Sequence, residues 1–136
     1  MKVNPYLLFS GNCREAFQAY AKILGGKIEG IMTFGEAPPE MQPRQGWNDK
    51  VMHAAMNFGG TVLMGSDAPP DHAEPMKGMS VSLNVDTPQE AERVWKAFAE
   101  GAQIRMELQP TFWAERFGML VDRFGTPWMI NCAKQQ

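Results

Sequence analysis

The sequence has little of what several classes of protein need. Its two cysteines, Cys13 and Cys132, are too few and too far apart for a disulfide framework or a zinc-binding spacing. No apolar run approaches the roughly 20 residues of a membrane span, and the N-terminus lacks the pattern of a secretion signal. There is no cluster of Lys and Arg, and the net charge is −2, which argues against nucleic acid or a membrane as a partner. We therefore expect a reduced, cytoplasmic protein.

The residues that are present are enough to build a packed interior. Hydrophobic residues make up 44% and aromatic residues 10% of the 136 positions, a composition that argues against a disordered chain. This length fits a single domain spanning 1–136. Eleven methionines are many for such a chain, and they indicate either adaptable core packing or an accommodating apolar pocket.

The sequence contains an internal repeat of a strand followed by a helix. In the first copy, "YLLFS" (6–10) is strand-like, and a helical apolar pattern follows until Gly25-Gly26. In the second copy, "MSVSLNV" (79–85) alternates as a strand, and a helical pattern follows until Gly101. We expect a capping box at the start of each helix. The residue pairs are Asn12 with Glu15 and Thr87 with Glu90. Such a repeat predicts two modules of the same architecture.

Three further strands are predicted after each helix. They are 27–34, 51–58 and 61–66 in the first module, and 104–110, 118–124 and 128–132 in the second. Each module is therefore a βαβββ unit, over 1–67 and over 78–136, and a Pro-rich loop joins the two. One such unit cannot bury both faces of its sheet. We predict an α+β fold in which paired βαβββ modules form a curved, mostly antiparallel mixed sheet with the helices on its outer face.

Polar and apolar side chains alternate along the predicted strands. The polar side carries His53 and Asn57 in one strand, Ser80 and Ser82 in another, and Glu107 in a third. A half-buried antiparallel sheet with a solvated outer face has this pattern. If the sheet curls, the same polar side lines a cavity, and the pattern alone fits both arrangements.

Several stretches of the chain carry a resemblance to a known family. They are "NPYLLFSGNCREAF" (4–17), "TFGEAP" (33–38), "HAAM" (53–56), "LMGSDAPP" (63–70) and "TFWAERFGMLVDRFGTPWMINCAKQQ" (111–136). On these stretches the chain resembles the PhnB-like branch of the vicinal oxygen chelate superfamily, which includes glyoxalase I, bleomycin- and fosfomycin-resistance proteins and extradiol dioxygenases. The resemblance implies the glyoxalase-like fold and a homodimer. A lyase or dioxygenase activity follows from it by analogy alone.

The same resemblance implies where a metal would be bound. Members with metal chemistry place His or Gln, Glu, His and Glu on the first, fourth, fifth and eighth strands. The matching positions here are 4–6, Leu63 or Met64, Ser80, and Met129. None of them is His, Cys, Asp or Glu, and thioether, hydroxyl and alkyl groups are poor ligands for a divalent ion. We expect no standard metal site and no cofactor, unless a divalent metal binds at a relocated site.

Other residues remain as candidates for function. His53 is a candidate general base or ligand-orienting donor, because an unperturbed imidazole titrates near neutral pH. The alternative is a histidine satisfied by a neighbouring group. The candidate ligand-binding residues on the predicted polar faces and loops are Asn57, Ser80, Ser82, Glu107, Trp113 and Asn131. Trp113 fits a ligand-stacking role or a dimer contact equally well, and Glu107 fits a solvated charge pattern with Arg105.

Two loops have more than one interpretation. Residues 35–50 are long and Pro-rich, which is typical of a lid over a cavity or of a dimer-contact arm. Residues 67–78 include Asp67, Asp71, His72 and Glu74, which form either a solvated loop or a relocated metal site.

Three functions are compatible with the sequence. The first is a small-molecule-binding protein without the standard metal ligands, which holds an unidentified organic ligand in the groove of the curved sheet. The second is a glyoxalase- or dioxygenase-like metalloenzyme with relocated ligands, and the third is a metal-free acid–base enzyme that uses His53. Some relatives carry a demethylubiquinone methyltransferase name. The sequence has no Gly-rich strand-to-helix loop of the nucleotide-binding kind, and we do not adopt that activity.

Overall fold

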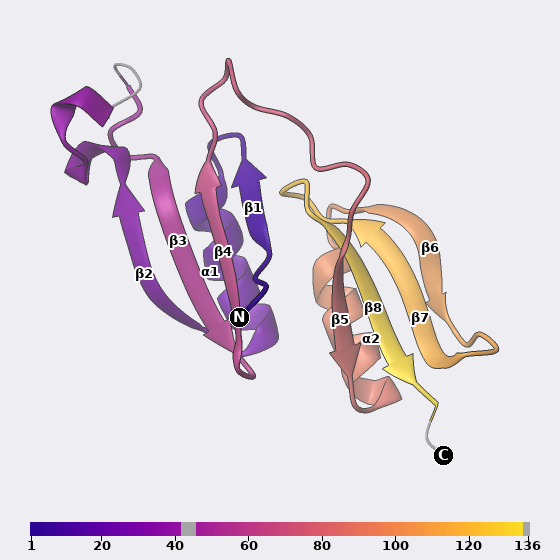
Figure 1. Ribbon diagram of the computed structural model, residues 1–136. Coiled ribbons are helices and arrows are strands. Elements are labelled where there is room, and N and C mark those ends of the chain that lie inside the picture. Colours follow the sequence, from indigo (N-terminus) through magenta and orange to yellow (C-terminus); the bar gives the residue numbers. More distant parts are fainter. Residues whose placement is uncertain (42–45, 135–136) are drawn as a thin grey trace. The chain divides into compact units, whose positions relative to one another are not determined.

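The chain forms two compact units in the computed structural model, which describes residues 1–41 and 46–134. Unit 1 is Met1–Pro75 and unit 2 is Met76–Gln136, and each contains one α-helix and one four-stranded sheet (Figure 1). The predicted pair of βαβββ modules is confirmed, and each module builds its own mixed sheet. No helix in the described part of the chain is long and apolar enough to cross a membrane.

Unit 1 follows the predicted order of elements. These are β1 (Tyr6–Phe9), α1 (Cys13–Leu24), β2 (Lys27–Thr33), the 3-10 turns η1 (Phe34–Glu36) and η2 (Pro39–Met41), β3 (Val51–Phe58) and β4 (Thr61–Asp67). The strand order in the sheet is β1-β4-β3-β2, with β1 parallel to β4 and the other pairs antiparallel. The two edge strands of this sheet are therefore β1 and β2, which come first in the sequence.

Unit 2 repeats this topology. Its elements are β5 (Val81–Val85), α2 (Pro88–Ala99), β6 (Gln103–Gln109), β7 (Ala114–Val121) and β8 (Pro127–Ala133). The strand order is β5-β8-β7-β6, with β5 parallel to β8 (Figure 1). The parallel pair of each unit brings its first and last strands side by side, although the helix and two strands separate them in the sequence.

Each helix packs on one face of its own sheet through aromatic side chains. In unit 1, Phe17 and Tyr20 of α1 contact Phe9 of β1, with ring centroids 6.2 and 6.5 Å apart. In unit 2, Phe98 of α2 contacts Trp128 of β8, with ring centroids 4.7 Å apart. We call the other face of each sheet, which its helix does not cover, the open face.

The predicted strand over 118–124 is wrong at both ends, because β7 begins at Ala114 and ends at Val121, after which a turn follows. The buried carboxylate of Asp122 holds that turn. Its Oδ1 accepts hydrogen bonds from the backbone N–H groups of Phe124 and Thr126 at 2.9 and 3.0 Å. Its Oδ2 accepts from the indole Nε1 of Trp128 at 2.8 Å. These contacts fix a turn where the apolar pattern indicated continued strand.

The capping box predicted at Asn12 is also wrong, because the side chain of Asn12 makes no capping hydrogen bond. Asp67, at the end of β4, supplies an acceptor instead. Its Oδ1 accepts from the backbone N–H groups of Gly11 and Cys13, and its Oδ2 accepts from that of Val51, each at 2.9 Å. One carboxylate with an exposed fraction of 2% therefore joins β4, the start of α1 and the start of β3.

At the second helix the predicted box forms in part. The hydroxyl oxygen of Thr87 accepts a hydrogen bond from the backbone N–H of Glu90 at 3.1 Å. The carboxylate of Glu90 binds the guanidinium of Arg93 one turn later. The exposed pair of Glu90 and Arg93 thus takes the place of the second half of the box.

Burial of Cys13 gives a prediction about stability at high pH. The residue has no exposed surface, and burial, together with the charge of Asp67, raises the pKa of its thiol from 9.0 to about 12. The Cys13 thiol ionises near pH 9 in the unfolded chain and near pH 12 in the folded chain. The contribution of the neutral thiol to stability is therefore complete below pH 9. It should decrease by about 1.4 kcal/mol per pH unit as the pH rises from 9 towards 12.

Chemical denaturation of the wild type and of Cys13→Ser at several alkaline pH values measures this contribution. A serine hydroxyl does not titrate in this range, and the two proteins share every other titratable group. The difference between their slopes of unfolding free energy against pH is therefore due to Cys13. Equal slopes in the two proteins would show that the thiol ionises normally in the folded state.

Candidate functional site

The open face of unit 1 carries the candidate general base. Tyr6 lies opposite Met64 in the parallel pair, Met64 lies opposite Ala55, and His53 lies opposite Met32 on the edge strand β2. Residues that face each other across a pleated sheet share a face. These side chains therefore lie on the face away from α1. Asn57 lies two residues after Ala55 and four after His53 on the same strand, so it shares this face.

His53 is held by a tyrosine that comes from the first strand. The phenol oxygen of Tyr6 and Nδ1 of His53 are 3.1 Å apart and hydrogen-bonded, and the two ring centroids are 5.7 Å apart. Within the described residues, the imidazole ring of His53 makes no other hydrogen bond. When the phenol donates to Nδ1, the proton of the neutral ring is on Nε2, which can donate to a ligand. When Nδ1–H donates to the phenol oxygen, Nε2 carries the lone pair and can accept a proton.

A surface depression of about 290 Å³ lies beside His53. Its lining residues are Glu29, Gly30, Ile31, Met32, His53 and Ala55. Most of this lining is apolar or backbone, and the polar side chains are one imidazole and one carboxylate. A largely apolar wall with few polar groups is the usual composition of a small-molecule site.

An irregularity in β2 shapes this depression. Ile28 pairs with Met56 and Gly30 pairs with Ala55, so Glu29 is an extra residue in the edge strand. Such a bulge bends a strand and redirects a side chain, and bulges are common at sheet edges and beside active sites. Gly30 leaves open space above Ala55, because no atom lies within 4 Å of the position a Cβ would take.

The open face of unit 2 carries two asparagines that lie side by side. Asn84 of β5 and Asn131 of β8 are paired in register, and Nδ2 of Asn131 donates to Oδ1 of Asn84 at 3.1 Å. Phe117 of β7 lies opposite Asn131 on the other side. Oδ1 of Asn131 is buried and has no hydrogen-bond partner among the described residues. Ser82 is exposed on the same strand as Asn84, whereas Ser80 precedes the strand.

The remaining predicted ligand residues of unit 2 are Trp113 and Glu107. Trp113 is 47% exposed before β7, and its ring contacts those of Phe112 and Phe117. Glu107 is exposed in β6, within the second of two shifts of register, which falls between Met106 and Gln109. These shifts break the predicted alternation, because Met106 pairs with Met119 on the open face instead of sharing a face with Ile104.

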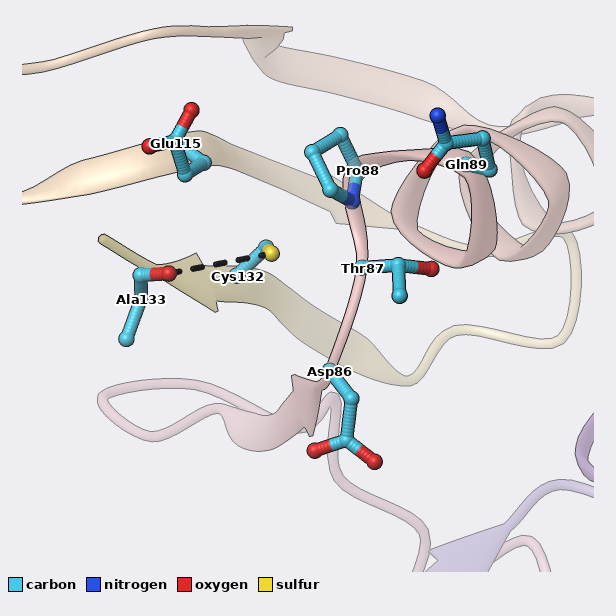
Figure 2. Close-up of a pocket in the computed structure, with 7 residues that line it drawn as sticks. All are labelled: Asp86, Thr87, Pro88, Gln89, Glu115, Cys132 and Ala133. Atoms are coloured by element: carbon cyan, nitrogen blue, oxygen red, sulfur yellow. Dashed lines mark hydrogen bonds between the residues drawn. The ribbon is translucent and has the colours of Figure 1, made fainter. Parts of the chain in front are cut away.

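A second depression, of about 320 Å³, lies at the start of α2. Figure 2 shows it between the turn after β5 and the ends of β7 and β8. Its lining residues are Asp86, Thr87, Pro88, Gln89, Glu115, Cys132 and Ala133. Sγ of Cys132 lies 3.9 Å from the carbonyl oxygen of Ala133, to which the thiol donates a hydrogen bond. No local pattern in the sequence indicates this depression, since residues far apart in the sequence form it.

The two loops with open interpretations are only partly described. Trp47 packs on Phe34, and Nζ of Lys50 donates to the carbonyl oxygen of Gly11, so the described part of the 35–50 loop is attached to unit 1. Residues 42–45 of that loop lie outside the described residues. In the 67–78 loop, the carboxylate of Asp67 is committed to backbone N–H groups of unit 1. The lid and dimer-contact interpretations of 35–50 stay predictions.

The residues at the family's metal positions do not fit a divalent ion. Leu63 is buried on the helix side, so the fourth-strand position on the open face is Met64, next to Tyr6. The eighth-strand position is Met129, which pairs with Ser82 and Met119. Thioether, phenol and hydroxyl groups are a poor donor set for Zn²⁺ or Mg²⁺. Among the described residues, no three His, Cys, Asp or Glu side chains converge as ligands elsewhere.

The fold defines the class of protein. A glyoxylase/bleomycin resistance protein/dioxygenase domain from Frankia sp. EAN1pec has the same fold, with a TM-score of 0.68 over 98% of both chains at 12% identity. The chain is therefore a glyoxalase-fold protein with structural neighbours in the vicinal oxygen chelate superfamily, as the sequence predicted.

Sequence comparison then gives the family. Residues 1–131 match the family described as 3-demethylubiquinone-9 3-methyltransferase, and the chain belongs to this PhnB-like family. It is 35% identical to protein YjdN of Escherichia coli K12, over 100% of this chain and 98% of that one.

Solved structures of relatives agree with this assignment. The crystal structure of protein PA1353 from Pseudomonas aeruginosa is 48% identical, with a TM-score of 0.90 over 99% of both chains. The PhnB protein of Bacillus cereus is 26% identical, with a TM-score of 0.80 over 98% of this chain and 100% of that one.

Proposed function

We propose that the chain is a small-molecule-binding protein that holds an organic ligand on the open faces of its sheets, without the standard metal ligands of its superfamily. The observation that carries the proposal is the hydrogen-bonded pair of Tyr6 and His53 at the edge of an apolar depression of about 290 Å³. An imidazole whose one nitrogen is held by a phenol presents the other nitrogen in a defined orientation. Fixed polar groups on an apolar wall select a ligand by its hydrogen-bonding group.

We propose further ligand contacts on the open face of each unit. Asn57 lies on the same strand as His53, and Ser82, Asn131 and Trp113 belong to unit 2. We propose Ser80 and Glu107 as further ligand contacts. We also propose that the protein is a cytoplasmic homodimer, supported by two free cysteines and by exposed apolar side chains such as Leu8 and Met32.

A second candidate function is acid–base catalysis by His53. The Tyr6 contact favours it, because an Nδ1–H that donates to the phenol oxygen leaves the lone pair on Nε2, which can then accept a proton from a substrate. A metalloenzyme with relocated ligands would need donors that the described residues do not bring together. Stoichiometric zinc, nickel, manganese or iron in protein purified without chelator would favour the metalloenzyme.

The family's description names a methyl transfer, which needs a methyl donor. The turns that lead into the two helices contain Gly11-Asn12 and Asp86-Thr87, and neither is a Gly-rich nucleotide-binding loop. We expect that S-adenosylmethionine does not raise the melting temperature of the chain, since a ligand that binds the folded state stabilises it. A saturable rise with this donor would support methyl transfer over the proposed function.

Replacing His53 with alanine should weaken ligand binding at the depression at least tenfold. The reason is the loss of about 1.4 kcal/mol or more of directed hydrogen bonding. Phenol, benzamide and benzoate serve as probes, since they share an aromatic body and differ in their polar group. The dissociation constants are measured by calorimetry on the full chain, and Tyr6→Phe should show a smaller loss because the imidazole remains but is less well oriented.

The other histidine of the chain provides the matched control. His72 is exposed in the loop after β4, so His72→Ala should leave the dissociation constants unchanged. Equal affinities of the wild type and His53→Ala for every probe that binds, or no binding of any of the three probes to the wild type, would contradict the proposed function.

A further inference from the structure

We propose that the open face of unit 2 recognises a planar aromatic molecule through a hydroxyl or N–H group, which donates a hydrogen bond to Oδ1 of Asn131. This inference rests on the proposed function, because it names the chemical class of ligand that one open face would take. The experiment follows residues of unit 2, so that a failure of this inference can be distinguished from a failure of the proposed His53 site.

The first step is the unpaired acceptor. Oδ1 of Asn131 is buried and has no hydrogen-bond partner among the described residues. Buried polar atoms are almost always paired, and an unpaired one costs the free energy of its lost hydration. A donor that completes this site therefore gains more than the same donor would at an exposed acceptor.

The second step is the orientation of the amide. Nδ2 of Asn131 donates to Oδ1 of Asn84 at 3.1 Å. This bond commits the donor end of the side chain to the neighbouring strand, so the end that remains for a ligand is the carbonyl oxygen. The complementary group on the ligand is a donor, either O–H or N–H.

The third step is the shape and polarity of the surroundings. Phe117 lies opposite Asn131, and its ring contacts Trp113, with centroids 5.3 Å apart. Trp113 in turn contacts Phe112, with centroids 4.8 Å apart, and Phe112 is 87% exposed. Met129 lies two residues before Asn131 on the same strand. Aromatic rings and thioethers favour an aromatic occupant, which gains stacking and sulfur–ring contacts.

The melting temperature of the variant Asn131→Leu distinguishes ligand recognition by Asn131 from a structural role in the fold. Asn131→Leu removes the unpaired acceptor and keeps a side chain of similar shape. The exposed Asn84 can then bond to water. We expect the melting temperature to rise by roughly 4 °C. If the bond between the two asparagines mainly stabilises the fold, the melting temperature should fall instead, and the proposal loses its main support.

The binding test compares phenol with anisole, which share a ring and an oxygen but differ in the O–H donor. NMR titration of the full chain follows the side-chain amide signals of Asn131 and Asn84. We expect the wild type to bind phenol at least tenfold more tightly than anisole at these residues. In Asn131→Leu the two dissociation constants should be equal.

Two further variants serve as controls. Asn12→Leu removes a second buried acceptor that has no partner among the described residues, at the start of α1, and should keep the preference for phenol. His53→Ala should also keep it at Asn131. If phenol perturbs the His53 depression alone, this inference is wrong and the proposed function stands. Equal affinities in the wild type, a preference for anisole, or no change at Asn131 with either compound would overturn the inference without reference to any variant.

Discussion

Replacing Asp67 with alanine should lower the free energy of unfolding by about 4 kcal/mol, because several buried donors lose their acceptor at once. The carboxylate accepts from the backbone N–H groups of Gly11, Cys13 and Val51, and its exposed fraction is 2%. The contacts of Cys13 and Val51 are buried, and that of Gly11 is partly buried. Urea denaturation measures the change.

The isosteric change Asp67→Asn is the informative companion. Its remaining carbonyl oxygen can serve the N–H groups of Gly11 and Cys13, whereas its NH₂ group faces the N–H of Val51. We expect a loss of about 2 kcal/mol, between wild type and alanine. Asp49→Ala, on an exposed turn residue, should change stability by less than about 0.5 kcal/mol. A loss for Asp67→Ala no larger than that of Asp49→Ala would contradict this role of the carboxylate.

Replacing Gly65 with alanine should lower the free energy of unfolding by about 3 kcal/mol through overpacking. A Cβ there would lie 2.8 Å from the carbonyl oxygen of Leu7 and 2.8 Å from Cε1 of Phe17. The carbonyl belongs to the paired strand β1, so the backbone would have to move away from β4. The same denaturation experiment measures the effect.

Gly30 is the matched control for this substitution. It lies in a strand of the same sheet, and no atom lies within 4 Å of its Cβ position. Gly30→Ala should therefore be within about 0.5 kcal/mol of the wild type. Equal losses at both positions would mean that the effect comes from removing glycine itself and not from the close approach of α1 and β1 to β4.

The fold could be predicted from the sequence because its signals are local. Alternation in 79–85 and helical spacing after Thr87 each depend on a few neighbouring residues, and the repeat then gives the second module. The capping of α1 could not be predicted, because Asp67 lies at the far end of the unit from Asn12 in the sequence. The local pattern indicated Asn12 and Glu15, whereas a carboxylate from β4 accepts from the neighbouring backbone N–H groups of Gly11 and Cys13.

The candidate site could be predicted only in part for the same reason. His53 was visible as a polar residue on an alternating strand. Its partner Tyr6 is 47 residues away, and it becomes a neighbour through the pairing of β1 with β4 and of β4 with β3. The bulge at Glu29 and the pairing of Asn84 with Asn131 also depend on register, which the alternation does not specify.

The central claim is that ligands bind on the open face of unit 1 beside His53. The most direct test is an NMR titration of the full chain with phenol, benzamide and benzoate, followed residue by residue through the backbone amides. We predict that at least one probe shifts the signals of 29–32 and 53–55 in a saturable way, with the His53 ring among the largest changes. Saturable shifts confined to 86–89 and 132–133, at the depression beside α2, or no saturable shift with any probe, would contradict the claim.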